Sequence, residues 1–224
     1  MRSALKSLIP ALVVVSAVAV TAQQQQQAPR RPSSPAGTAQ TQVGGKWVTP
    51  ADKPGAAPRY QDGKWIEVTY GRPISKGREN IFGSGADYGV AVRGGTPVWR
   101  AGANQTTVMR TEVPLVFGCK TLPAGEYGLL VDLKSPESWT LILTSQPRQK
   151  AFDANNKTDL IGAVNYDPKF DVIRVPMTVD PGLDLRLDQL TIFFCDVTKD
   201  GGKLAIAWET TVAMAEFKVG GAGR

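Results

Sequence analysis

Apolar and polar residues alternate with a period of two in nine short runs of this chain. A strand that buries one face has this period, because successive side chains point to opposite faces of its sheet. Turn-forming stretches such as Leu122-Pro123-Ala124-Gly125 separate the runs. The predicted strands are 65–70, 106–110, 113–117, 127–133, 139–143, 171–177, 190–197, 204–211 and 214–219.

The spacing of these strands predicts an all-β fold. Nine or ten short strands between turns are typical of a single antiparallel β-sandwich or jelly-roll-like domain. We find no extended helical pattern in the sequence. Residues 147–160 are the one place where we expect a short helix or a long loop.

The first 22 residues have the features of a secretory signal peptide. Arg2 and Lys6 precede an apolar run over 9–20, and small residues at Val20-Thr21-Ala22 suit a cleavage site. A membrane anchor is the alternative, but this run is shorter than the roughly 20 residues that span a bilayer. We therefore expect an exported protein, periplasmic or extracellular, with no transmembrane segment in the mature chain.

Residues 23–59 differ in composition from the rest of the chain. They are rich in Gln, Pro, Ala and Gly and poor in large apolar residues. Such a segment buries too little apolar surface to offset the entropy of ordering. We therefore expect a disordered linker over 23–59 and the β-sandwich domain over 60–224.

The charge of +6 is concentrated at the N-terminal end. The expected signal peptide holds two basic residues, and the expected linker holds five against one acid, which leaves 19 of each sign in the domain. Nucleic-acid binding normally needs a concentrated basic face. We therefore expect no nucleic-acid partner.

The chain contains no histidine. Catalytic triads or dyads that use histidine and histidine-ligated metal sites are thus excluded. We expect no metal and no cofactor, and we find no nucleophile motif. A pair of carboxylates acting as a glycosidase remains open. Its candidate acids are Asp167, Asp171, Asp196 and Glu209.

Several short motifs together resemble the bacterial domain-of-unknown-function family 2911. The resemblance covers about residues 64–219 and implies an exported bacterial protein without an assigned activity. The stretch Ser84–Pro97 is longer than the family's usual link, and Cys119 and Cys195 lie outside the family pattern. The motifs are Arg72-Pro73, Lys76-Gly77-Arg78, Ile81-Phe82-Gly83, Tyr88-Gly89, Val98-Trp99-Arg100, Gly102-Ala103-Asn104, Leu122-Pro123-Ala124-Gly125 with Tyr127, Trp139-Thr140, Asn165-Tyr166-Asp167 and Trp208-Glu209.

Arg100 follows Trp99 in this pattern, and three further cations lie among glycines in the loop 70–78. A guanidinium beside an indole can stack and present a fork to a carboxylate, a phosphate or sugar hydroxyls. This suggests a polar pocket with an aromatic wall. Its candidate residues are Arg72, Lys76, Arg78, Trp99, Arg100, Asn104 and Tyr166.

A purely structural role explains the same residues. Arg100 would then pair with an internal acid such as Glu209 or Asp167, and the tryptophans would belong to the core. Of the two roles, we favour the structural one for Arg100. Cys119 and Cys195 lie in an exported chain, where a disulfide between them is possible, and two separate buried thiols are the alternative.

These observations favour a non-catalytic binding domain for a carbohydrate or an anionic small ligand of the bacterial envelope. A protein–protein interaction or structural module of the envelope is the second hypothesis, with an envelope protein as its partner. A carboxylate-pair glycan hydrolase is the third.

Overall fold

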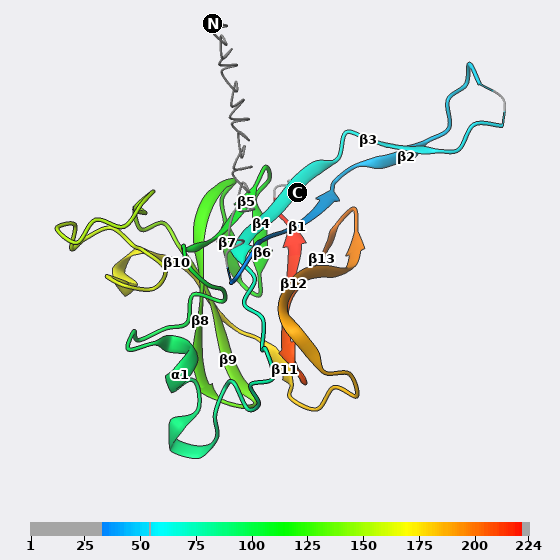
Figure 1. Cartoon of the computed structure of the whole chain (residues 1–224). Helices are drawn as coiled ribbons and strands as arrows, with labels where there is room; N and C mark the ends of the chain where they lie inside the picture. Colours follow the sequence, from blue (N-terminus) through cyan, green and yellow to red (C-terminus); the bar gives the residue numbers. More distant parts are fainter. Residues whose placement is uncertain (1–32, 54, 221–224) are drawn as a thin grey trace, which may run out of the picture. The chain divides into compact units, whose positions relative to one another are not determined.

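Strands account for most of the regular structure in the computed structural model, which describes residues 33–53 and 55–220 (Figure 1). These residues belong to a unit that begins at Pro32. The expected signal peptide, residues 1–22, lies outside the described residues. Within them, no helix is long and apolar enough to cross a membrane.

The fold is an all-β sandwich of antiparallel strands. The first sheet has the order β1 (Ala36–Val43), β4 (Lys64–Gly71), β5 (Thr107–Thr111), β8 (Gly125–Ser135), β9 (Ser138–Thr144) and β10 (Asp171–Pro176). The second has the order β12 (Leu187–Thr198), β13 (Gly201–Glu209), β14 (Thr211–Val219), β6 (Leu115–Phe117) and β7 (Lys120–Leu122), and β11 (Thr178–Asp180) also pairs with β14.

Small elements complete the described part of the chain. A separate two-stranded ribbon consists of β2 (Lys46–Val48) and β3 (Arg59–Gln61). The helical elements are η1 (Gly85–Asp87), α1 (Val90–Arg93) and η2 (Pro168–Phe170). Residues 147–160 form a long loop, which is one of the two alternatives expected there, and among the described residues the α-helical turn lies at Val90–Arg93.

The nine predicted strands all correspond to strands of the structure. The run 204–211 is interrupted, because Glu209 and Thr210 form the turn between β13 and β14. Side chains alternate as the pattern predicts. Ile66 and Val68 of β4 are fully buried, whereas Trp65 of the same strand is exposed on the opposite face. The core therefore forms between the two inward faces.

Three connections carry the chain between the two sheets. The chain crosses to the second sheet after β5 and again after β10, and it returns to the first sheet between β7 and β8. Pro176 ends β10, which is an edge strand of the first sheet. A proline is tolerated there because its missing N–H would interrupt the hydrogen bonds of an inner strand. At one edge of the sandwich, β7 of the second sheet contacts β10 of the first.

An aromatic cluster fills one part of the core. Phe82 lies 5.0 Å from Trp139 and 5.6 Å from Trp99 between ring centroids, and Trp99 stacks on Trp208 at 6.5 Å. Trp139 Nε1 donates a hydrogen bond to the Tyr88 hydroxyl, so the buried indole N–H is satisfied. Of the motif aromatics, Phe82, Tyr88, Trp99, Trp139 and Trp208 are thus core residues.

The structure differs from the expectation of a disordered linker over 23–59. Strand β1 lies inside that segment and pairs with β4 along its whole length, from Ala36↔Gly71 to Val43↔Lys64. Only Ala39 and Val43 of β1 are buried. An edge strand is stabilised here by backbone hydrogen bonds to its neighbour, which a count of large apolar residues does not register. Residues 23–32 lie outside the described part.

Cys119 and Cys195 are free thiols rather than a disulfide. Cys195 lies on β12, and Cys119 lies in the turn after β6. Strands β13 and β14 separate β12 from β6, so the two thiols stand about 14 Å apart at the usual strand spacing. A disulfide needs Cα atoms within about 7 Å, so this geometry excludes the bridge.

Candidate functional site

A polar cleft of about 450 Å³ opens beside strands β8 and β10. Its walls combine an aromatic ring and two prolines with four charged side chains. The charges balance, since two are basic and two are acidic. The lining residues are Pro97, Val98, Lys120, Asp132, Tyr166, Pro168, Asp171, Val172 and Arg174.

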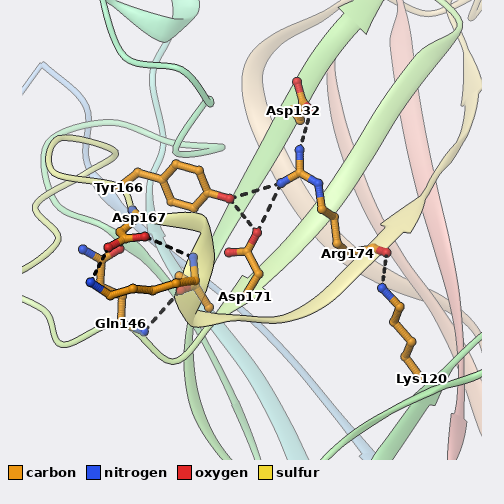
Figure 2. A network of polar contacts seen from close by, with 9 residues as sticks. Lys120, Asp132, Gln146, Tyr166, Asp167, Asp171 and Arg174 are labelled. Carbon is orange, nitrogen blue, oxygen red and sulfur yellow. Dashed lines mark hydrogen bonds and ion pairs between the residues drawn. The ribbon is translucent and has the colours of Figure 1, made fainter.

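Arg174 is the centre of the polar network in this cleft (Figure 2). Its Nη2 donates to Asp132 Oδ2 at 2.6 Å, and its Nη1 donates to Asp171 Oδ2 at 3.2 Å. Nη1 also donates to the Tyr166 hydroxyl at 3.1 Å. The Tyr166 hydroxyl in turn donates to Asp171 Oδ2 at 2.6 Å. One guanidinium therefore holds two carboxylates and a phenol in a fixed arrangement.

The sheet brings Asp132 and Arg174 to the same face. On β8, Val131 and Leu133 point into the core, so Asp132 points outward. On β10, Ile173 points into the core and Arg174 points outward. Strand β9 lies between β8 and β10, and the long arginine side chain spans it diagonally.

Asp171 occupies a β-bulge. The pairing of β10 with β9 shifts between Asp171 and Ile173, which face Thr144 and Leu143. A bulge re-aims a side chain relative to the regular alternation. The Asp171 side chain is only 9% exposed, and its Oδ1 is buried with no hydrogen-bond partner among the described residues. A buried carboxylate oxygen without a donor carries a desolvation cost.

Burial changes the ionisation of the network. It raises the pKa of the Asp171 carboxyl, although the hydrogen bonds from Tyr166 and Arg174 oppose this shift. Burial and the bond to Asp171 raise the pKa of the Tyr166 hydroxyl, which therefore remains a neutral donor. Burial lowers the pKa of Arg174, but its acidic neighbours outweigh that effect and raise it overall.

Buried amides position the loop that carries Tyr166. Gln146 Nε2 donates to the carbonyls of Thr158 and Asn165 at 2.8 and 2.7 Å, and Gln146 Oε1 accepts from Asp167 N at 3.0 Å. Asn165, with φ +63°, donates to the carbonyls of Asn156 and Asp159. The Tyr166 ring also packs on a small cluster that includes Leu130 and Leu160. The aromatic wall is thus held rigidly.

Lys120 reaches the cleft from the second sheet. Its Nζ donates to the carbonyl of Arg174 at 3.2 Å (Figure 2). An ammonium carries three N–H donors, so two remain for a ligand. Lys120 and Arg174 together oppose the two carboxylates, and the cleft as a whole carries no net charge.

Of the seven residues predicted for a pocket, Tyr166 lines this cleft and six do not. Arg72 donates from Nε to the Leu190 carbonyl and from Nη2 to the Thr191 hydroxyl. Arg78 donates to the carbonyls of Ser75 and Ile74. These two guanidiniums therefore hold backbone segments of the protein.

Trp99, Arg100 and Asn104 are directed differently. The segment at Trp99 pairs with Val131 of β8, so Trp99 points into the core and is 1% exposed. Arg100 Nη1 donates to the Asn104 carbonyl at 2.7 Å, and Asn104 Nδ2 donates to the Ser34 carbonyl at 3.2 Å. Lys76 is exposed, and its backbone is in the left-handed region with φ +51°.

The suggested ion pair of Arg100 with Glu209 or Asp167 is wrong. Glu209 pairs with Arg186 at 3.2 Å, and Asp167 pairs with Lys169 at 2.6 Å. Within residues 33–53 and 55–220, Arg100 forms no ion pair. It packs closely on Gly162, where a Cβ would lie 2.5 Å from Nη1, and burial lowers its pKa.

The candidate acids for a glycosidase are distributed over separate clusters. Asp196 pairs with Lys203 at 2.7 Å, and Glu209 lies at the turn after β13. Asp167 is held by Lys169, whose hydrogen bonds lower the pKa of the Asp167 carboxyl. Of the four, Asp171 alone lines the cleft. Its carboxylate neighbour there, Asp132, is bound to the same arginine.

Lys120, Asp132 and Arg174 were missed by the sequence analysis. Asp132 and Arg174 are polar positions inside apolar alternation, which is a usable signal for an outward-facing residue. Their convergence depends on β8, β9 and β10 being neighbours, and that order is a property of the sheet.

The family model described as a protein of unknown function, DUF2911, matches residues 54–217. The chain belongs to this family. The match covers both sheets apart from β1 and the last residues of β14. No curated protein and no solved structure matches the chain. The family description assigns no activity. A proposal for the function therefore has to rest on the cleft.

Proposed function

We propose that this protein is an exported, non-catalytic binding protein that holds a neutral saccharide in the cleft at Tyr166, Asp171 and Arg174. The observation that carries the proposal is Asp171, a residue of the cleft wall whose Oδ1 is buried without a hydrogen-bond partner among the described residues. A ligand hydroxyl that donates to this oxygen would offset its desolvation cost.

The chemistry of the walls favours a polyol. Saccharides present hydroxyl groups that donate and accept, together with C–H faces that pack on rings. The cleft has carboxylate acceptors, the free ammonium N–H groups of Lys120, and apolar surface from Tyr166 and two prolines. Its volume of about 450 Å³ lies within the range of small-molecule sites.

The charge balance favours a neutral ligand over the anionic one that the sequence also allowed. Asp132 and Asp171 match the charges of Lys120 and Arg174, and most of Arg174's fork is already occupied by carboxylates and a phenol. An added anion would meet the two carboxylates without a free guanidinium to receive it. A neutral sugar has no such penalty.

Thermal-shift and calorimetric titration of the full chain test this proposal. The neutral probes are glucose, galactose, mannose, xylose and cellobiose, and the anionic probes are galacturonate and glucose 6-phosphate. A ligand at one hundred times its Kd stabilises by about 2.7 kcal/mol. At roughly 2 to 4 °C per kcal/mol, the Tm should rise by several degrees.

Variants assign the binding to the cleft. Asp171→Asn removes the anionic acceptor, and Lys120→Ala removes the free donors while touching only an exposed side chain; each should weaken binding at least about tenfold. Arg100→Ala is the matched control because Arg100 does not line the cleft, and its affinity should be unchanged. No binding by any neutral probe, or affinity lost in Arg100→Ala alone, would refute the cleft as the site.

A further inference from the structure

An exposed tryptophan, Trp65, lies on the solvent-facing side of the first sheet. Trp65 of β4 is 45% exposed, whereas its neighbours along the strand, Ile66 and Val68, are fully buried. The indole therefore faces away from the core and does not pack inside it. Its role has to be sought on the surface.

Polar side chains from three adjacent strands surround Trp65. Gln40 comes from β1, Glu67 from β4 and Arg110 from β5, and Glu112 follows β5 directly. With Trp65 they line a hollow of about 230 Å³. The hollow lies on the outer surface formed by β1, β4 and β5, because all three strands send their alternate residues into the core.

The hollow is rigid before any ligand arrives. Trp65 N donates to Glu112 Oε2 at 2.9 Å, and Glu112 N donates to the Trp65 carbonyl at 3.0 Å. Gln40 Nε2 donates to Glu67 Oε2. These bonds fix the Trp65 backbone, both carboxylates and the Gln40 amide, so binding would cost little ordering entropy.

Arg110 supplies free donors in this hollow. It stands opposite Glu67 in the register of β4 and β5, yet within the described residues its guanidinium forms no hydrogen bond and no ion pair. A planar fork beside an exposed indole can donate two parallel hydrogen bonds to vicinal oxygens. The ring offers an apolar face for the C–H side of a sugar.

We propose that Trp65, Gln40, Glu67, Arg110 and Glu112 form a second saccharide site, which binds neutral oligosaccharides. Two carboxylates face one guanidinium there, so the surface repels acidic glycans. The hollow lies on the outer surface of the sheet and has about half the volume of the cleft beside β10, so it would hold a short stretch of a longer chain that continues across the surface. This site does not depend on the cleft, and the two can be tested separately.

Intrinsic fluorescence and calorimetry of the full chain provide the test. Trp99, Trp139 and Trp208 are at most 4% exposed, so quenching by a surface ligand reports on Trp65 or on Trp47, which is 71% exposed. The probes are cellohexaose, mannohexaose and maltohexaose, with hexagalacturonate as the acidic comparison. A neutral hexasaccharide should quench the emission, and hexagalacturonate should not.

Matched variants separate the possible sites. By calorimetry, Trp65→Ala should weaken hexasaccharide binding about tenfold or more, Arg110→Ala should weaken it as well, and Trp47→Phe should leave it unchanged. The double variant Lys120→Ala/Asp171→Asn removes the cleft and should leave this binding in place. If that double variant alone abolishes binding, the cleft is the only site.

Three results would overturn the second site. They are the absence of binding by all three neutral hexasaccharides, equal affinity in Trp65→Ala and the unchanged protein, and binding of hexagalacturonate as tight as that of a neutral probe. None of them decides the fate of the cleft, since short sugars and the Lys120→Ala variant test it independently.

Discussion

Arg174 with Asp171 and Arg186 with Glu209 form two ion pairs of the same kind. In each, an arginine side chain that is 38% or 39% exposed meets a carboxylate side chain that is 9% exposed. Each carboxylate also has one oxygen without a hydrogen bond, Asp171 Oδ1 and Glu209 Oε1. Burial and pairing alone therefore do not distinguish them.

Their other contacts distinguish them clearly. Glu209 Oε1 still lies 3.2 Å from Arg186 Nη2, and Glu209 Oε2 accepts from Ile81 N at 2.7 Å. That bond holds the segment that inserts Phe82 into the aromatic cluster. Among the described residues, Asp171 Oδ1 has no hydrogen-bond donor, and Asp171 lines the cleft of about 450 Å³. This difference supports Asp171, rather than Glu209, as the carboxylate of the proposed ligand site.

The largest effect is expected for Glu209→Ala. It leaves Ile81 N without its acceptor and Arg186 without its buried partner, so the free energy of unfolding should fall by about 2 to 3 kcal/mol. Chemical denaturation measures this loss. Glu216→Ala, at an exposed residue of β14, is the control and should change stability by less than about 0.5 kcal/mol. Equal effects of the two variants would remove the structural role of Glu209.

Arg100→Ala should have a smaller effect of about 1 kcal/mol. It loses one hydrogen bond to the Asn104 carbonyl and the packing of the side-chain stem on Gly162, but it breaks no ion pair. Thermal denaturation beside Lys150→Ala, an exposed lysine, checks this. A loss of stability as large as that of Glu209→Ala would show that Arg100 forms a stronger interaction than this hydrogen bond and this packing.

Asp171 should make stability depend on pH in a defined direction. Its folded-state pKa is raised by burial, so the folded protein binds this proton more tightly than the unfolded chain does. The contribution is fully present below the unfolded pKa of about 3.9 and is lost as the pH rises through the folded pKa. Relative to Asp171→Asn, the unchanged protein should therefore gain stability as the pH falls from 7 towards 4.

Urea denaturation of both proteins at several pH values between 4 and 7 measures this difference. A difference that is constant across the range, or that grows with rising pH, would contradict the raised pKa. Asp167→Asn is a useful comparison, because hydrogen bonds from Lys169 lower the pKa of Asp167 and its trend has the opposite sign.

The smallest effect concerns the cysteines. Because both are free thiols, added reductant should leave the Tm unchanged, whereas a bridge over this span would be worth about 4 kcal/mol. Thiol labelling of the native protein should find two reactive groups. Cys119, which is exposed, should react first, and burial raises the pKa of the Cys195 thiol and slows it. Labelling of fewer than two thiols, or a lower Tm in reductant, would indicate a disulfide between Cys119 and Cys195.

The sequence predicted the strands well and the site poorly, for different physical reasons. A period of two is local, so β4, β8, β9 and β12 follow from their own residues. Strand β1 was missed because its stability comes from pairing with β4, which its composition does not reveal. Tyr166 and Asp171 were singled out from the sequence, but Asp132 and Arg174 meet only because β9 lies between their strands.

Arg100 shows the same limit from the other side. Its motif suggested either a ligand or an internal acid, and the structure gives it a backbone carbonyl and a glycine. Residue types cannot identify a backbone carbonyl as the partner, because every residue has one. Residue types therefore predict which groups can bind, but the sheet order and the loops decide which of them face one another.

The pairing of β1 with β4 also determines how this protein can be shortened. A chain that begins at residue 60 would lack β1, and β4 would expose the N–H and C=O groups that β1 now occupies over eight residues. An uncovered strand edge next to apolar residues such as Ile66 and Val68 is a template for pairing with another copy. We therefore expect a chain that begins at residue 60 to associate through this edge more readily than a chain that keeps β1.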